Sequence, residues 1–389
     1  MTLKFDNPFI LAPMAGITDM PFRRLMRKMG TGAVISEFVS AHAIKNNSPK
    51  LKKYLAYHED ERPVGIQLFG GEDEILAHAA QIVEGVGVDF VDINLGCPVP
   101  KVTKKGGGSA WLCHPVDLGK MLALVKSRIQ IPLTIKIRTG WDDSSKNALE
   151  IVKIAHNEGI AAVAIHGRTR AQGYSGQPDW DFISEIASES KVPIIGNGDI
   201  ITGPLAAARL RTSGCAAVMI GRGALKNPWI FQEAVEALTL ADALSPDQQK
   251  NLFATVLQKH ELPETGTLPA GRDYFHRKVK KLQPKPTEYV SDWVKIRADR
   301  NAQELIDLHL SLLRETYPEE RAEFAFRKFL AWYAAGYPGA KEFRKFVFTT
   351  EEFPRIVERT VQFFEGVKLL GAKGEEQREN DPLFSSGHG

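Results

Sequence analysis

The sequence predicts an α/β protein, a (β/α)8 TIM barrel followed by a smaller all-helical C-terminal domain. Two observations carry this prediction. Short apolar or β-branched runs alternate with longer helical patterns over residues 9 to about 230, the spacing of a barrel with eight parallel strands. After Pro228 the strand patterns stop and helical patterns follow. A doubly wound open sheet also fits the periodicity, but the motifs at the strand ends disfavour it.

Eight segments have the length and composition of buried strands. They are Phe9–Met14, Ala33–Ser36, Val64–Phe69, Phe90–Asn94, Leu133–Arg138, Ala162–His166, Ile194–Asn197 and Ala217–Ile220. Helical patterns lie between most of them, for example Asp73–Val86, Pro115–Lys126, Asn147–Asn157 and Pro204–Arg211. This alternation is typical of parallel strands joined by helical crossovers.

The C-terminal part is predicted to be helical. Ala302–Thr316 carries leucines on one helical face, and Glu320–Gly336 is a second helix rich in aromatic residues. The run TTEE at 349–352 indicates a capping box at the start of a last helix. That helix is expected to bury Ile356, Val357, Val361 and Phe364. We expect four parts: a barrel over 1–240, a linker and basic insertion over 241–300, a helical domain over 301–370 and a disordered tail over 371–389.

The composition is that of an ordinary globular protein, with 43% hydrophobic and 25% charged residues in 389. The sequence contains no run of 18 apolar residues and no signal-peptide pattern, so we expect a cytoplasmic protein without a membrane segment. Three scattered cysteines do not form a disulfide framework. The pair Cys113-His114 is too isolated for a metal site, so no metal is expected. We expect a monomer.

The positive charge is concentrated in one segment. Residues 271–300 hold nine Lys and Arg against four Asp and Glu, whereas the whole chain has a net charge of only +3. The rest of the chain is therefore slightly acidic. The small net charge of the whole chain does not by itself imply a nucleic-acid partner. The concentration of positive charge in residues 271–300 is more informative than the net charge.

Polar or glycine-rich groups follow every predicted strand. In a barrel the carboxyl ends of the strands carry the chemistry. The groups at these ends are Pro13-Met14-Ala15, Glu37, Gln67, Asn94 through Cys97, Lys136 and Arg138, His166, Asn197 through Asp199, and Gly221-Arg222. The alternative is that polar residues merely terminate strands.

The loops after the last two strands indicate a phosphate-bearing ligand. Gly198-Asp199 and Gly221-Arg222 stand where barrels commonly bind phosphate through backbone N–H groups, and Arg222 adds positive charge. Either loop alone could equally be an ordinary turn that needs glycine. The two together favour a phosphate.

Lys136 and Gln67 are expected to point into the barrel. A buried lysine can form a Schiff base with a sugar phosphate, as in aldolases, or can face the N1/C2 edge of a flavin. It can also be a structural, salt-bridged residue. Gln67 can donate to and accept from the pyrimidine rim of a flavin, a role that an aldolase does not require.

Cys97 is the most informative single residue. It follows a strand in DINLGCP, between Gly96 and Pro98, so it is expected on a constrained loop at the barrel mouth. A thiol with an ordinary pKa near 8.5 stays largely protonated at neutral pH and can deliver a proton. Gly106-Gly107-Gly108 would let this loop move over a substrate. Cys215 instead fits a small buried hydrophobic residue.

These residues resemble the tRNA-dihydrouridine synthases, and in particular their bacterial B-type branch. The signature of that family is matched by VDINLGCPVPKVTKKGGGSA at 91–110. Further matching runs are APMAGITDMPFR (12–23), KIRTGW (136–141), HGRTR (166–170), NGD (197–199) and IGRGALKNPWIF (220–231). The resemblance covers residues 1–235 closely and the helical region near 302–365 more loosely.

The resemblance implies an FMN enzyme that NADPH reduces. Hydride then passes from flavin N5 to C6 of a uridine in the tRNA D-loop, and Cys97 protonates C5. The implied FMN contacts are Pro13, Met14, Ala15, Gln67, Lys136, His166, Asn197, Gly198, Asp199, Gly221 and Arg222. Asn94, Arg138 and Arg168 are implied contacts of the uridine or its phosphate, and Arg327 and Lys328 of the RNA.

The stretch 261–300 departs from the family's compact helical domain. Its lysines and arginines alternate with aromatic residues, which suggests an additional tRNA-contacting arm. The alternative is a solvated loop whose aromatic residues pack on the helical domain.

Two other functions remain open. A small-molecule flavin barrel, such as a dihydroorotate or dihydropyrimidine oxidoreductase, shares the expected site but gives no reason for a basic helical domain. An RNA-binding or RNA-folding protein without catalysis does not explain Cys97, Lys136 and the phosphate loops. Bound flavin and retention of bulk tRNA separate the three.

Overall fold

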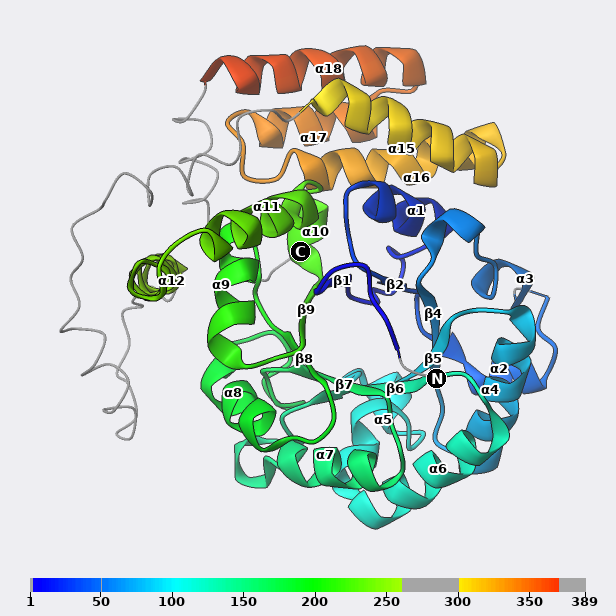
Figure 1. The fold of residues 1–389 in the computed structure, drawn as a ribbon. Helices are drawn as coiled ribbons and strands as arrows, with labels where there is room; N and C mark the ends of the chain where they lie inside the picture. The colour runs from blue at the N-terminus through cyan, green and yellow to red at the C-terminus, as the bar shows by residue number, and fades with distance from the viewer. Residues whose placement is uncertain (1–2, 50, 261–300, 371–389) are drawn as a thin grey trace.

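The computed structural model describes residues 3–49, 51–260 and 301–370, with side chains to 367. Eight parallel strands form a ring at its centre, with helices around them (Figure 1). The order around the ring is β1-β9-β8-β7-β6-β5-β4-β2, and a parallel bridge between Ile10 and Ala33 joins its two ends. The ring is therefore closed, which confirms the predicted barrel and excludes the open sheet. The basic insertion and the tail expected at 261–300 and 371–389 lie outside the described residues.

The eight ring strands follow the predicted segments closely. They are β1 Phe9–Leu11, β2 Val34–Ile35, β4 Val64–Phe69, β5 Phe90–Leu95, β6 Leu133–Arg138, β7 Ala162–His166, β8 Ile194–Asn197 and β9 Ala217–Ile220. A short extra strand, β3 Val39–Ser40, pairs with β4. The first strand ends at Leu11 instead of Met14, because residues 12–15 leave the sheet at the barrel mouth.

Helices cover the outside of the ring. Those of the barrel are α1 Met20–Lys28, α2 Ala41–Lys45, α3 Leu51–Tyr54, α4 Asp73–Val86, α5 Pro100–Thr103, α6 Pro115–Arg128, α7 Ala148–Asn157, α8 Trp180–Glu189, α9 Gly203–Ser213, α10 Arg222–Lys226 and α11 Ile230–Asp242. Short 3-10 turns lie at Glu59–Glu61, Gly108–Cys113 and Asp143–Ser145. Several helices begin after a residue whose side chain caps them. Thr202, for example, accepts the N–H of Leu205 (3.2 Å), and Pro204 follows in the first turn.

The strands alternate between an apolar outer face and a mixed inner face. In β6, Leu133, Ile135 and Ile137 pack outward into the main core, whereas Lys136 and Arg138 occupy the alternate positions. The amino-terminal part of the interior is filled by a separate apolar cluster that includes Ile10, Phe90, Ile195 and Met219. The carboxyl-terminal part is lined by polar groups. The barrel interior is therefore packed with apolar side chains at its amino-terminal end and lined by polar groups at its carboxyl-terminal end.

One glycine makes room for the largest residue of the inner cluster. A Cβ on Gly65 would lie 2.2 Å from the Phe90 ring, so only glycine fits opposite that ring on β4. Phe5 meets Phe90 edge-to-face, with ring centroids 6.2 Å apart. Together these rings close the amino-terminal end of the barrel. The opposite, carboxyl-terminal end is therefore where a ligand site is expected.

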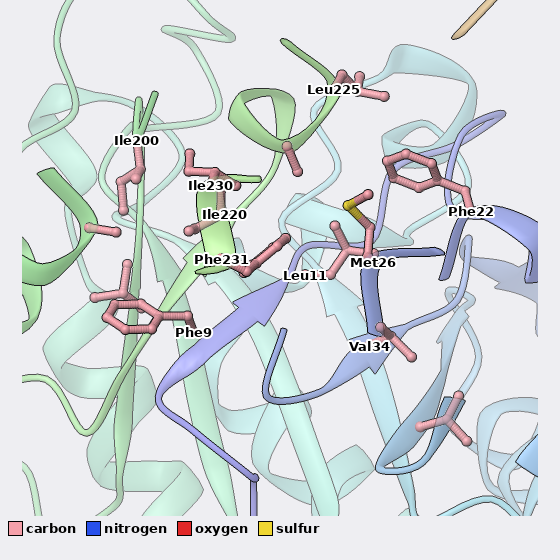
Figure 2. Close-up of a cluster of buried hydrophobic side chains, with 14 of the residues drawn as sticks. Phe9, Leu11, Phe22, Met26, Val34, Ile200, Ile220, Leu225, Ile230 and Phe231 are labelled. Carbon is pink, nitrogen blue, oxygen red and sulfur yellow. The ribbon is translucent and has the colours of Figure 1, made fainter. Parts of the chain in front are cut away.

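The outer core joins the strands to their helices (Figure 2). Phe9 and Leu11 of β1, Phe22 of α1 and Phe231 of α11 all belong to one buried cluster. The same cluster continues into the C-terminal helices. Barrel and helical domain therefore share a continuous hydrophobic core.

The C-terminal helices form a second layer on one side of the ring, next to α1 and α10 (Figure 1). They are α15 Ala302–Thr316, α16 Glu319–Tyr333, α17 Ala340–Thr349 and α18 Phe353–Leu370. The expected all-helical domain is thus confirmed. Before it, α12 Pro246–His260 packs on α9, so the first part of the stretch expected as a linker is an ordered helix. Among the described residues no helix is long and apolar enough to cross a membrane.

Aromatic rings fasten the helical domain to the barrel. Phe329 of α16 stacks on Phe22 of α1, with centroids 5.1 Å apart. His309 of α15 is fully buried beside them and hydrogen-bonds Tyr333 through Nδ1 (2.8 Å). Burial lowers the pKa of His309 to about 3, so its ring is neutral at physiological pH. At the rim of this contact, Tyr317 donates to Asp19 (2.8 Å).

Replacing Phe329 with alanine is expected to lower the free energy of unfolding by about 3–5 kcal/mol, because a fully buried ring leaves a cavity. Equilibrium urea unfolding measures the change. The matched control is Phe324→Ala on the same helix, where the ring is 79% exposed and the expected effect is below about 0.5 kcal/mol. Equal effects of the two substitutions would show that the Phe22–Phe329 stack does not stabilise the protein.

Candidate active site

A cavity of about 420 Å³ opens at the carboxyl ends of the strands, within the size range of ligand sites. Most of the residues predicted to bind the cofactor line it. Those that do are Pro13, Met14, Ala15, Lys136, His166, Asn197, Gly198, Asp199, Gly221 and Arg222. Cys97, Asn94 and Arg138 also lie in its wall. The structure therefore brings together residues from six of the predicted strand ends.

The parallel register explains why these side chains meet. Asn94 lies opposite Lys136, and Arg138 lies opposite His166, which in turn lies opposite Asn197. In parallel strands, residues at matching positions point to the same side of the sheet. Two successive levels of the barrel wall therefore turn polar groups toward the cavity: Asn94 with Lys136, and Arg138 with His166 and Asn197.

Cys97 lies on the loop after β5, which is held at several points. Its N–H donates to Asn94 Oδ1 (2.9 Å), and its carbonyl accepts from Ser109 Oγ (2.9 Å). Arg138 Nε donates to the Gly96 carbonyl (2.9 Å). Gly108 has φ +58°, and a Cβ there would lie 2.8 Å from the Cys97 carbonyl oxygen. In this structure Gly108 thus serves close packing against the loop.

The Cys97 side chain is half-buried at the cavity wall. Burial raises the pKa of its thiol above the ordinary value, while the Val99 N–H and the Arg138 charge act in the opposite direction. The thiol is therefore protonated at neutral pH. The environment suits a proton donor and does not suit a thiolate nucleophile.

Lys136 and His166 both line the cavity, but they differ in charge. Burial, together with the charge of Arg138, lowers the pKa of Lys136 to about 8, so it is mostly an ammonium at pH 7. It donates to Asn197 Oδ1 (3.2 Å). Burial and the charge of Lys136 lower the pKa of His166 well below its usual value. His166 is therefore neutral, so one ring nitrogen can donate a hydrogen bond and the other can accept one.

Asp199 organises the arginines at the end of β8. It accepts from Arg168 (2.9 Å) and from Arg222 (3.2 Å), and its own φ of +43° is unusual for a residue other than glycine. Arg222 is partly exposed and lines the cavity, whereas Arg168 is only 2% exposed and does not. Arg168 thus lies behind the site, where it also donates to the carbonyls of residues 175 and 176.

Gln67 is also placed behind the cavity wall. It is fully buried and hydrogen-bonds Asp92 and Asn94. Direct contact of Gln67 with a cofactor stays a prediction. Its side chain contacts two residues of β5, and its backbone N–H donates to Ser36 Oγ (3.2 Å).

Arg138, Arg327 and Lys328, which were predicted to contact the substrate, have partners within the chain. Arg138 donates to the carbonyls of Gly96, Thr169 and Gly173. Arg327 donates to three carbonyls at the end of α17, and Lys328 to the Gly16 carbonyl (2.5 Å). Lys328 thereby ties α16 to the loop after β1. Contact of these cations with RNA stays a prediction.

Three aromatic residues of the cavity lining were not anticipated: Phe38, Tyr174 and Trp332. Tyr174, 53% exposed at the rim, lies beneath the guanidinium groups of Arg222 (4.6 Å to the ring centroid) and Arg138 (5.6 Å). Trp332 of α16 reaches the cavity from the helical domain. Tyr174 stands in a loop away from the strand end, and Trp332 is more than 100 residues beyond β9. No local pattern could have placed either one there.

Among the described residues no cluster of His, Cys, Asp and Glu could hold a metal ion, and all three cysteines are free. The site therefore consists of a protonated thiol, a buried ammonium, a neutral imidazole and two glycine-containing loops. These features define a barrel enzyme whose chemistry takes place at the carboxyl ends of its strands.

Residues 10–267 match the model of the dihydrouridine synthase (Dus) family, and the chain belongs to that family. It is 35% identical to tRNA-dihydrouridine synthase B of Pseudomonas putida over 87% of this chain and 86% of that one. It is 40% identical to the enzyme of the same name from Pasteurella multocida over 66% and 77% of the two chains. The resemblance inferred from the motifs is thus confirmed.

A third relative, tRNA-dihydrouridine synthase B of Pseudomonas syringae pv. tomato, is 34% identical over 96% of this chain and 95% of its own. The match therefore spans both the barrel and the helical domain. Among solved structures, histamine dehydrogenase from Rhizobium sp. 4-9 matches 64% of this chain and 48% of its own at 13% identity and a TM-score of 0.47. That likeness is too low to indicate a ligand.

Proposed function

We propose that this protein reduces the C5–C6 double bond of uridines in the D-loop of tRNA to dihydrouridine, with FMN as the cofactor and NADPH as the reductant. The observation that carries the proposal is the protonated, half-buried thiol of Cys97 in the wall of a cavity that also holds Lys136. The family and its tRNA-dihydrouridine synthase relatives support the substrate.

The residues of the cavity fit FMN. The Lys136 ammonium has three N–H donors, and among the described residues its hydrogen-bond acceptor is Asn197 alone, so donors remain for an electron-rich ring edge. Arg222 and the loops at Gly198 and Gly221 suit a phosphate. Bound in its reduced form, FMN supplies a hydride to C6 of the uracil.

Cys97 supplies the proton that completes the reduction. The thiol S–H bond breaks, the proton goes to C5, and the resulting thiolate regains a proton from solvent. The loop donates a hydrogen bond to Asn94 and accepts hydrogen bonds from Ser109 and Arg138, and these bonds fix the thiol toward the cavity. The neutral His166 can hydrogen-bond the bound ring without adding charge.

The target base must leave its stack to reach a cavity of this depth, as base-modifying enzymes require. The mouth is lined by Tyr174 and, from the helical domain, by Trp332. Aromatic faces stack on unpaired bases. We propose that both domains contact the tRNA. The helical domain is expected to contact the phosphate backbone of the RNA, so the affinity for tRNA should fall as the salt concentration rises.

Bulk tRNA from a strain lacking dihydrouridine, incubated with the purified protein and NADPH, tests this function. The expected results are a yellow protein and new dihydrouridine, detected by mass spectrometry of digested nucleosides. Free uracil and orotate serve as control substrates and should not be reduced. A colourless protein that cannot be reconstituted with FMN, or reduction of the free bases alone, would contradict the proposal.

A further inference from the structure

Three polar side chains form a buried row beneath the Cys97 loop. The strand register places Gln67 opposite Asp92, and Asp92 opposite Thr134. Gln67 Nε2 donates to Asp92 Oδ2 (2.6 Å), and Thr134 Oγ1 donates to Asp92 Oδ1 (2.6 Å). Asp92 is 1% exposed and does not line the cavity. The carboxylate therefore has a role other than direct contact with a substrate.

The row continues to the loop through Asn94. Its Nδ2 donates to Gln67 Oε1 (2.8 Å). Its Oδ1 accepts the N–H groups of Gly96 (3.2 Å) and Cys97 (2.9 Å). An unbroken chain of hydrogen bonds thus runs from Asp92 through two amides to the backbone of Cys97.

The acceptor oxygens of Asp92 at the start of this chain set the direction of its hydrogen bonds. An ionised carboxylate accepts and cannot donate, so Gln67 must turn its NH₂ toward Asp92 and its oxygen toward Asn94. Asn94 must then donate to Gln67 and present its own oxygen to the loop. If Gln67 were flipped, two NH₂ groups would face each other, and Asn94 would turn an NH₂ toward the N–H of Cys97. Burial raises the pKa of the Asp92 carboxyl above its ordinary value, while the hydrogen bonds from Gln67 and Thr134 and the charge of Lys136 act in the opposite direction. Both carboxyl oxygens accept a hydrogen bond from a neutral donor, which is the pattern of an ionised carboxylate.

We propose that Asp92 is a positioning residue, which orients the amides of Gln67 and Asn94 and thereby fixes the Cys97 thiol in the cavity wall. The inference rests on the proposed role of Cys97 as proton donor. It gives Gln67 and Asn94 a task in addition to any contact with cofactor or substrate. It also explains why Asp92 and Asn94, the two inward positions of β5 that follow Phe90, are polar.

The test compares Asp92→Leu with Asp92→Asn. Leucine keeps the volume but removes both hydrogen bonds. Asparagine can still accept from Gln67 and donate to the hydroxyl of Thr134, although it removes the charge. Asp92→Leu is expected to lower kcat for dihydrouridine formation by about 10²-fold, because a thiol displaced by about 1 Å transfers its proton poorly. Asp92→Asn should restore most of the rate, with KM for tRNA little changed in either variant.

A second measurement reports on Cys97 without tRNA. The rate of alkylation by iodoacetamide is followed against pH in a Cys113→Ser background, which removes the exposed thiol. A released loop exposes the thiol and lowers its raised pKa, so Asp92→Leu should be alkylated severalfold faster at pH 7. Gln67→Met interrupts the same chain and should give the same change, and the double variant no further change. If Asp92→Leu does not fold, Gln67→Met alone provides the test.

The two proposals fail in distinguishable ways. If the wild-type protein forms no dihydrouridine, the proposed function fails, while alkylation still reports on the loop. If the wild-type protein is active and neither Asp92→Leu nor Gln67→Met changes the alkylation of Cys97, the positioning role is wrong. Equal losses in Asp92→Leu and Asp92→Asn would show that Asp92 acts by its charge instead of by orienting the amides.

Discussion

Cys97→Ala is expected to lower dihydrouridine formation by about 10²–10⁴-fold, the usual contribution of a positioned general acid. Flavin content and NADPH oxidation by oxygen should stay close to wild type, because neither requires the proton at C5. Single-turnover reduction of tRNA, with dihydrouridine measured by mass spectrometry, gives the size of the loss. Cys113→Ala is the matched control, since that thiol is exposed outside the cavity.

The pH dependence gives a second check on Cys97. The thiol must be protonated to act, and burial raises its pKa. The rate should therefore stay level through neutral pH and fall only as pH rises past the ordinary cysteine pKa of about 8.5. The residual rate of Cys97→Ala should not show this fall at alkaline pH. A normal product yield from the variant would refute the proton-donor role.

Lys136→Met is expected to weaken FMN binding by about 10–100-fold. A hydrogen bond to a charged group contributes about 1.5–3 kcal/mol, and a factor of ten in affinity corresponds to 1.4 kcal/mol. Methionine keeps the length of the side chain but removes the ammonium from the cavity. Quenching of flavin fluorescence on titration of the apoprotein measures the affinity. Lys120→Met, at an exposed position on α6, is the control and should bind FMN normally.

The pKa of Lys136 predicts how this affinity changes with pH. Burial lowers it to about 8, and the protonated form is the one that favours an anionic ligand. The FMN affinity of the wild-type protein should therefore fall as pH rises through about 8. The FMN affinity of Lys136→Met should not change over the same pH range. An identical pH profile in both proteins would mean that Lys136 does not carry the relevant charge.

The inward positions of the strands could be predicted from the sequence because they depend on a local period of two. In LTIKIR the apolar residues alternate with Lys136 and Arg138, and the structure places the former in the outer core and the latter at the cavity. The same period of two places Asp92 and Asn94 of β5 on the inner face of the barrel. Strand ends, and with them most of the cavity lining, follow from this local rule.

The partners of these polar groups could not be predicted in the same way. Arg327, which is predicted to contact RNA, donates to carbonyls about 20 residues away at the end of α17. Arg168, which is predicted to contact the uridine or its phosphate, is buried against Asp199. A guanidinium has five donors and a long flexible stem. Only the packed chain decides which acceptors come within its reach.

The sequence by itself determined the barrel, the helical domain, and the position of Cys97 at the barrel mouth, because periodicity and strand-end chemistry are local properties of the chain. The tertiary structure decided how that cysteine is held. Asp92, Gln67 and Asn94 lie on two strands that become neighbours only in the folded sheet, and Trp332 comes to the cavity from a separate domain. Hydrogen-bond direction and burial arise from such long-range contacts, and they keep the Cys97 thiol protonated and oriented.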